Sequence, residues 1–336
     1  MQQTRFGRTG WMVSRTAVGC IPIQRIPMDE SDALLRRAAG AGVNLFDTAR
    51  GYTDSEERVG RALAAVRGRV YIATKSGASG PEGLRRDLDT SLRQLATDYV
   101  DLYQLHNPST VPGPGDPLYD ALLGLRREGR IRAIGLTNHS LERALQAVRS
   151  GHYDAVQYPI SPLSTDAELA LAGECRRHDV GLLAMKALGG GLIAEAGVAF
   201  AFLRRYPEAV PIWGVQRMGE LEELLGYEER PPAEDDAWRA RLAHYRAEGS
   251  GAFCRACGYC LPCPAGIPIP MAARMSLMLG RSRPDLWTTP EWRAKMALIE
   301  KCARCGGCAK RCPYHLDTPA LLAGEWKKYR AYLDRD

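Results

Sequence analysis

Two cysteine runs near the C-terminus constrain the fold of this chain more than any other feature. They hold eight of its ten cysteines. The runs comprise Cys254, Cys257, Cys260 and Cys263, followed by Cys302, Cys305, Cys308 and Cys312. Each run ends in a Cys-Pro pair, and two residues separate successive cysteines, except for three before Cys312. A segment with this spacing must fold as a tight loop around something that binds several thiolates.

The spacing favours two [4Fe–4S] clusters. Three thiolates so spaced hold three corners of a cubane, and a distant cysteine followed by proline supplies the fourth, usually to the partner cluster. By this exchange, one predicted ligand set is Cys254, Cys257, Cys260 and Cys312, and the other is Cys302, Cys305, Cys308 and Cys263. Zinc sites prefer separated cysteine pairs, and disulfides are disfavoured in a reducing cytosol. Zinc and a structural thiol cluster stay open as alternatives.

The composition is that of an ordinary globular protein. At 336 residues the chain can form one large domain and a smaller one. The net charge of +6 arises from interspersed acidic and basic residues, which argues against a nucleic-acid surface. The sequence shows neither an apolar run of membrane-helix length nor the apolar stretch of a secretory signal. We therefore expect a cytoplasmic protein without nucleic-acid or membrane partners.

Residues 1–232 alternate short strand-like segments with helical ones. The strand candidates are residues 16–20, 44–47, 70–74, 100–106, 131–136, 155–157, 181–186 and 211–215. The helix candidates are residues 29–41, 55–66, 81–95, 117–128, 141–150, 165–178, 197–205 and 219–225. Eight strands, each followed by a helix, predict an α/β fold, the (β/α)8 TIM barrel. A hairpin over residues 5–14 would plug its N-terminal end.

The remainder, residues 238–336, is predicted to be a helical ferredoxin-like domain with two 4Fe–4S clusters. Pro231, Pro232 and the acidic residues 234–236 interrupt the alternation and are typical of a domain boundary. Residues 238–247, 269–279 and 319–333 have helical periodicity. The 38 residues between Cys263 and Cys302 exceed the spacer of a compact two-cluster ferredoxin. The arrangement resembles the helical module of succinate dehydrogenase iron–sulfur subunits.

Polar residues at the C-terminal ends of barrel strands are candidates for catalysis. Asp47 ends the second strand, Lys75 follows the third and His106 ends the fourth. Tyr52 stands five residues beyond Asp47. A neighbouring lysine would lower the pKa of the tyrosine, against the opposite effect of desolvation, and Asp47 would keep that lysine charged. Tyr52 could then protonate a carbonyl oxygen that His106 orients, while a hydride reaches the carbonyl carbon.

At this point the chain resembles the aldo-keto reductase superfamily. Residues 6–10 (FGRTG) and 47–60 match the family pattern, and the entire chain is similar to the branch with a C-terminal 4Fe–4S ferredoxin-type domain. The resemblance implies a catalytic tetrad of Asp47, Tyr52, Lys75 and His106. It also implies NADP(H) or NAD(H) bound without a Rossmann motif, and no strand–GxGxxG–helix element is found here.

The resemblance implies further contacts to the cofactor. They are Thr137, Asn138, Gln157, Met185, Lys186, Gly189, Gly190, Gly191, Arg217 and Glu223. The first three have hydroxyl or amide groups suited to the nicotinamide carboxamide. The glycines permit a close backbone approach to the pyrophosphate, and the arginine and glutamate are candidates for the 2′-phosphate and the adenosine. Many relatives have an aromatic residue where this chain has Met185-Lys186, which leaves room for a flavin or an anionic substrate.

Three functions remain open from the sequence. The first, which we favour, is NADP(H)-dependent reduction of a small-molecule carbonyl or oxidation of an alcohol, with clusters for electron transfer or stability. The second is an iron–sulfur redox enzyme fed by one-electron carriers, with or without a flavin. The third is a nucleotide-sensing regulatory subunit, against which the complete tetrad counts. Basic residues beside the cysteines, Arg255, Lys301, Lys310 and Arg311, could dock an acidic carrier such as ferredoxin or flavodoxin.

Overall fold

The computed structural model describes residues 1–248, 253–281 and 284–334, and the chain divides into two compact units. Unit 1 contains Met1–Leu188 and Glu195–Arg241, and unit 2 contains Gly189–Ala194 and Leu242–Asp336. The division falls within helix α9 (Asp236–Glu248). Each unit has a hydrophobic core of its own. Within the described ranges, no helix is long and apolar enough to cross a membrane.

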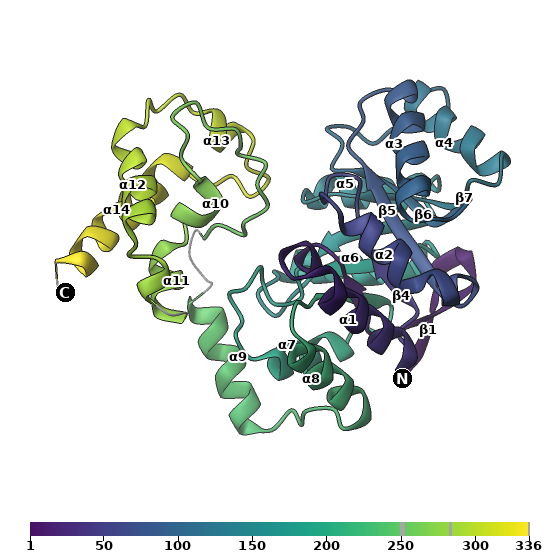
Figure 1. Cartoon of the computed structure of the whole chain (residues 1–336), viewed down its shortest axis with the longest axis horizontal. Helices are drawn as coiled ribbons and strands as arrows, with labels where there is room; N and C mark the ends of the chain where they lie inside the picture. Colours follow the sequence, from purple (N-terminus) through teal and green to yellow (C-terminus); the bar gives the residue numbers. More distant parts are fainter. Residues whose placement is uncertain (249–252, 282–283, 335–336) are drawn as a thin grey trace. The chain divides into compact units, whose positions relative to one another are not determined.

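Unit 1 is a closed barrel of eight parallel strands (Figure 1). Each strand pairs with the next one along the chain, and the last closes on the first. The strands are β3 (Ala17–Gly19), β4 (Leu45–Asp47), β5 (Tyr71–Ser76), β6 (Val100–His106), β7 (Ile131–Thr137), β8 (Ala155–Pro159), β9 (Gly181–Met185) and β10 (Ala209–Gly214). The predicted (β/α)8 barrel is confirmed. Strand β9 ends one residue earlier than expected, where Lys186 takes a left-handed backbone conformation with φ 58°.

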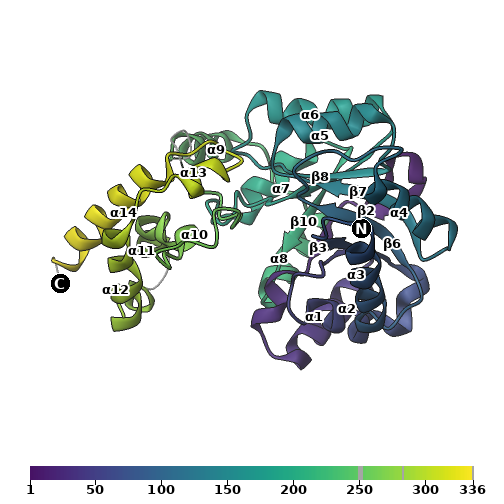
Figure 2. The same cartoon turned by 90° about the horizontal axis from the view of Figure 1, so that it is seen from above.

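A helix follows each strand, and together the helices surround the barrel (Figure 2). They are α1 (Met28–Gly40), α2 (Ser55–Leu63), α3 (Pro81–Gln94), α4 (Pro117–Arg127), α5 (Leu141–Ser150), α6 (Asp166–Arg177), α7 (Ala196–Arg204) and α8 (Met218–Glu229). Several of these helices begin at a residue whose side chain caps the first turn. At α6, for example, Thr165 and Glu168 form a capping box. The helix predicted over residues 55–66 ends at Leu63 and continues as the 3-10 helix η3 (Ala64–Arg69).

The N-terminal hairpin covers the N-terminal ends of barrel strands. Strands β1 (Gln3–Phe6) and β2 (Trp11–Ser14) pair antiparallel across the 3-10 turn η1 (Gly7–Thr9). Trp11 stacks on Tyr71, the first residue of β5, at a centroid distance of 4.9 Å. Phe6 lies against Gly181, the first residue of β9, where an added Cβ would come within 2.6 Å of the ring. The hairpin thus closes this end, and the C-terminal ends of the strands are left to build a site.

Unit 2 is helical. Besides its part of α9, it contains α10 (Ile269–Ala272), α11 (Met275–Arg281), η4 (Pro284–Leu286), α12 (Pro290–Ala297), η5 (Leu298–Lys301), α13 (Gly307–Lys310) and α14 (Thr318–Leu333). Helices α10, α11 and α13 all contact α14. The helix expected over residues 269–279 is interrupted between α10 and α11, and Glu325 of α14 accepts the Ser276 N–H at 2.7 Å. Sequence periodicity did not predict α12 or α13, because helices this short contain too few turns to show a repeating pattern of apolar residues.

Candidate active site and cysteine cavities

Asp47 and Lys75 form a buried ion pair at the C-terminal ends of β4 and β5. Lys75 Nζ lies 2.7 Å from Asp47 Oδ2. The same carboxylate accepts Gln104 Nε2 on Oδ1 at 3.3 Å and Gln157 Nε2 on Oδ2 at 3.4 Å. Burial acts against the ammonium, but Asp47 and its neighbours outweigh it and raise the pKa of Lys75. The lysine is therefore charged at neutral pH.

Gln104 is a site residue that the sequence argument missed. It lies between Leu102 and His106 on the inward face of β6, by the alternation of side chains along a strand. The signal that could have identified it is an amide side chain two residues before His106, on the same face of a predicted strand; the structure shows that this amide is fully buried. Its amide holds Asp47 from the side opposite the lysine contact, on the other carboxylate oxygen.

Tyr52 lies in the loop between β4 and α2, which backbone hydrogen bonds fasten. Its N–H donates to Ala49 at 3.0 Å, and its carbonyl accepts the Ser55 N–H at 2.7 Å. Lys75 Nζ lies 5.1 Å from the ring centroid. Burial raises the pKa of Tyr52 more than the Lys75 ammonium lowers it. The lysine thus acts in the expected direction, but desolvation has the larger effect, so the pKa of Tyr52 lies above its ordinary value and the hydroxyl keeps its proton.

His106 completes the group. Its ring lies edge-on to that of Tyr52, with centroids 6.0 Å apart and an interplanar angle of 82°. Burial, assisted by the Lys75 charge, lowers the pKa of His106 to about 3. The imidazole is neutral near pH 7, so it can hydrogen-bond an oxygen but holds no extra proton to give away. The structure therefore brings all four predicted residues of the tetrad together at one end of the barrel.

The three residues predicted to meet a carboxamide lie beside this group. Asn138 is committed to its loop, donating to Pro108 O and accepting the Ser140 N–H, each at 2.9 Å. The Gln157 amide oxygen is different: it is buried and has no hydrogen-bond partner within the described part of the chain. An orphaned acceptor of this kind suits the NH2 of a nicotinamide carboxamide, so the residues present fit that cofactor. Thr137, which ends β7, is also buried.

Residues 184–188, at the end of β9 and just after it, include no aromatic side chain that could stack on a nicotinamide ring. Met185 packs partly buried against the barrel core, with Sδ 4.0 Å from Thr137 Oγ1. Lys186 follows in its left-handed conformation. A thioether is flexible and polarisable, so Met185 can contact a flat ring without the orientation that stacking would impose.

Two of the remaining predicted cofactor residues belong to α8 and its N-cap. Arg217 is exposed and pairs with Glu220 at 2.8 Å, and Glu223 accepts the Tyr227 hydroxyl at 2.7 Å. An exposed ion pair contributes little, so Arg217 can exchange its partner for another anion. Gly189, Gly190 and Gly191 all have positive φ and belong to unit 2. Their roles at a cofactor stay predictions.

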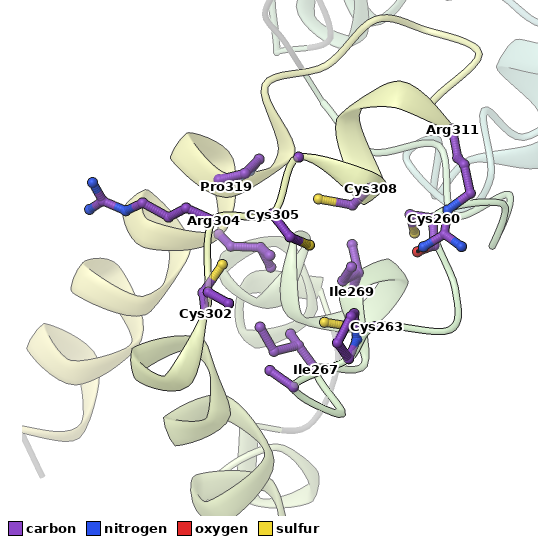
Figure 3. Close-up of a pocket in the computed structure, with 15 residues that line it drawn as sticks. Cys260, Cys263, Ile267, Ile269, Cys302, Arg304, Cys305, Cys308, Arg311 and Pro319 are labelled. Atoms are coloured by element: carbon purple, nitrogen blue, oxygen red, sulfur yellow. Dashed lines mark hydrogen bonds between the residues drawn. The ribbon is translucent and has the colours of Figure 1, made fainter.

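The cysteines of unit 2 line two cavities. The first, called cavity A, is lined by Cys260, Cys263, Cys302, Cys305 and Cys308. The second, cavity B, is lined by Cys254, Cys257, Cys260 and Cys312. Figure 3 shows the sulfurs of Cys263, Cys302, Cys305 and Cys308 directed toward a common space. Each cavity thus gathers the four thiols of one predicted ligand set.

The spread of these thiols suits a cluster better than a single ion. In the residues that the structure describes, no three His, Cys, Asp or Glu side chains are placed to hold one metal ion. A zinc ion needs its sulfurs about 2.3 Å from one centre, whereas a cubane takes one thiolate at each of four separated irons. Of the eight cysteines, Cys305 is exposed, Cys260 is buried and the other six are half-buried.

Solved structures share the fold. An aldo-keto reductase from Klebsiella pneumoniae in complex with NADPH has a TM-score of 0.64 at 24% identity, covering 73% of this chain and 95% of that one. The holo form of aldo-keto reductase AKR11C1 from Bacillus halodurans has a TM-score of 0.63 at 20% identity, covering 73% and 96%. These likenesses concern the barrel architecture.

Comparison of sequences adds the family. "Probable aldo-keto reductase 1" of Glycine max is 30% identical over 217 residues, which is 59% of this chain and 62% of that protein. "Aldo-keto reductase str7" of Strobilurus tenacellus is 34% identical over 180 residues, or 49% and 52%. The chain thus spans between half and two thirds of the length of these relatives. Residues 253–317 match the 4Fe-4S dicluster domain. Residues 10–199 match the aldo/keto reductase profile, and the chain therefore belongs to the aldo/keto reductase family.

Proposed function

We propose that the chain is an NADP(H)- or NAD(H)-dependent oxidoreductase that reduces the carbonyl group of a small molecule or oxidises the corresponding alcohol. The observation that carries the proposal is the meeting of a protonated tyrosine, a charged lysine and a neutral histidine at one end of the barrel. Active sites of (β/α)8 enzymes lie at this end of the strands. The NADPH complex of the Klebsiella relative supports the choice of cofactor.

The roles of the residues follow from their protonation states. The His106 imidazole, being neutral, hydrogen-bonds and orients the substrate oxygen. The Tyr52 hydroxyl donates its proton to that oxygen, and the Lys75 ammonium stabilises the phenolate that Tyr52 becomes. Asp47 holds the lysine in place and keeps it charged. When bound, the nicotinamide cofactor supplies the hydride, and the orphaned Gln157 oxygen would hold its carboxamide.

For unit 2 we propose two [4Fe–4S] clusters, one in cavity A and one in cavity B. A nicotinamide passes two electrons as hydride, whereas a cubane passes one, so direct exchange would need an intermediary such as a flavin. We therefore assign the clusters a separate electron-transfer or stabilising role. Exposed Cys305 is close in the sequence to the exposed cations Lys301 and Arg304, which suits the docking of an acidic one-electron carrier.

Two measurements on the full-length protein test these proposals. Anaerobically purified protein should contain about eight iron and eight sulfide per chain, and stoichiometric zinc without sulfide would overturn the clusters. Turnover of NADPH with a panel of aldehydes should be equal with the clusters held oxidised and pre-reduced. Activity that requires reduced clusters or a one-electron donor would instead favour the iron–sulfur redox enzyme. Cofactor binding without turnover of any carbonyl would favour a regulatory subunit.

A further inference from the structure

One guanidinium ties the two cysteine runs together. Arg311 Nη2 donates to the carbonyl oxygens of Cys260 at 2.7 Å and Pro262 at 2.9 Å. Its Nε donates to Gly307 O of its own helical turn at 3.2 Å. Figure 3 shows the guanidinium beside Cys260. Arg311 belongs to the second run, and the carbonyls that Nη2 reaches belong to the first, so these contacts bridge about 50 residues of sequence.

Each of the two bridged segments carries one thiol for each cavity. In the first run, Cys260 belongs to the ligand set of cavity B and Cys263 to that of cavity A. In the second run, Cys308 belongs to cavity A and Cys312, the residue after the arginine, to cavity B. By joining the segments, Arg311 therefore fixes the two ligand sets relative to each other. The shortest hydrogen bond that Arg311 donates goes to the backbone carbonyl of Cys260, which lines both cavities.

A second arginine in the same cavity provides a contrast. Arg304 also lines cavity A. Both arginines are exposed, but in Figure 3 the side chain of Arg304 extends away from the cysteines. Both arginines are positively charged and line the same cavity. They differ because Arg311 hydrogen-bonds to the other cysteine run, whereas Arg304 extends away from the cysteines. A variant of Arg304 is thus a matched control for one of Arg311.

We propose that Arg311 is a positioning residue for one-electron transfer between the two clusters. The inference rests on the two clusters proposed above. The planar fork of the guanidinium sets the separation of the ligand sets, a task that a lysine ammonium, as a point charge, does not reproduce. Its positive charge also favours the more negative, reduced state of a neighbouring cluster, because net charge and hydrogen bonding set cluster potentials. One cluster loses the electron that the other gains, and no proton is needed.

The experiment compares full-length wild type, Arg311→Gln, Arg311→Lys and Arg304→Gln after anaerobic purification. Iron and sulfide are assayed, midpoint potentials are titrated, and the reduced proteins are examined by electron paramagnetic resonance. In the wild type, two reduced clusters at a fixed short separation should show spin–spin interaction. Arg311→Gln should weaken that interaction and make at least one potential more negative. Arg311→Lys should restore the potential but not the interaction, and Arg304→Gln should match the wild-type interaction.

Four outcomes decide between these possibilities. Arg311→Gln with wild-type potentials and spin–spin interaction would overturn the inference. If this variant fails to hold iron, Arg311→Lys decides: an unchanged interaction overturns the inference, and a weakened one supports it. A wild-type protein with fewer than about eight iron would count against the two clusters themselves. Full iron content with unresponsive Arg311 variants would leave the clusters standing and remove only the role of Arg311.

Discussion

Lys75 Nζ lies 2.7 Å from Asp47 Oδ2, and both side chains are almost completely buried. The pair joins the C-terminal ends of two neighbouring strands, β4 and β5, and it faces Tyr52. A charge in such a place depends on its partner, because burial strongly penalises an isolated ion. The same pair therefore sets both the stability of this end of the barrel and the electrostatics of the proposed proton donor.

Removing one residue of the Asp47–Lys75 pair should lower the free energy of unfolding more than removing both. Lys75→Met leaves the Asp47 carboxylate buried without its cation and should lower the free energy of unfolding by about 3–5 kcal/mol. The double variant Lys75→Met with Asp47→Leu should recover much of that loss, since no lone charge remains. Urea denaturation at neutral pH, followed by far-ultraviolet circular dichroism, measures both. A single variant as stable as the wild type would mean that the ion pair is absent in solution.

Tyr52→Phe should lower kcat by at least ~100-fold, the lower end of general acid–base contributions. The phenyl ring keeps the edge contact with His106, so KM should change little. Tyr99→Phe is the matched control, since this tyrosine interacts through its ring with Arg67 and Arg132 and should leave turnover unchanged. Steady-state oxidation of NADPH with an accepted aldehyde measures the effect, and wild-type turnover by Tyr52→Phe would exclude it as the proton donor.

His106 should make the protein less stable in mild acid. Its pKa is about 3 in the folded protein, against an ordinary value of about 6.5. Below about pH 6.5 the unfolded chain binds a proton that the folded chain does not, so the free energy of unfolding falls as the pH is lowered toward 3. His106→Asn should flatten this dependence, whereas a variant of the exposed His244 should not. Denaturation midpoints between pH 4 and 8 give the comparison, and parallel curves for His106→Asn and wild type would contradict the lowered pKa.

The contact between the hairpin and the barrel predicts a difference between two glycines. In Gly181→Ala the new Cβ would lie 2.6 Å from the Phe6 ring, and such overpacking costs about 1–3 kcal/mol. Gly68→Ala, where no atom lies within 4 Å of an added Cβ, should be tolerated. Denaturant unfolding of the two variants measures the difference. Equal stabilities would show that Phe6 does not press on β9 in solution.

Much of the architecture could be predicted because it is encoded by local pattern. The alternation of strand and helix segments predicted the barrel. Each kind of segment could be recognised because the spacing of its apolar residues reflects which side chains are buried. The position of Asp47 and His106 at strand ends predicted that they would meet, because parallel strands end at one edge. The predicted grouping of the eight cysteines followed from two rules: three thiolates in one short loop hold one cluster, and the distant cysteine before a proline usually serves the partner cluster.

The tertiary structure decided the pKa values and the long-range hydrogen bonds, because these depend on what packs around a residue and not on its neighbours in the sequence. The pKa of Tyr52 is raised and not lowered, because the cost of burial depends on everything packed around the ring. Gln104 holds Asp47 from 57 residues away, a partnership that no local spacing encodes. Arg311, which as a sequence feature resembled any charge beside a cysteine, reaches the carbonyls of the other run only because the fold brings them within hydrogen-bond distance. Desolvation and long-range hydrogen bonds arise only when the chain is packed, and they determine how the predicted residues can act.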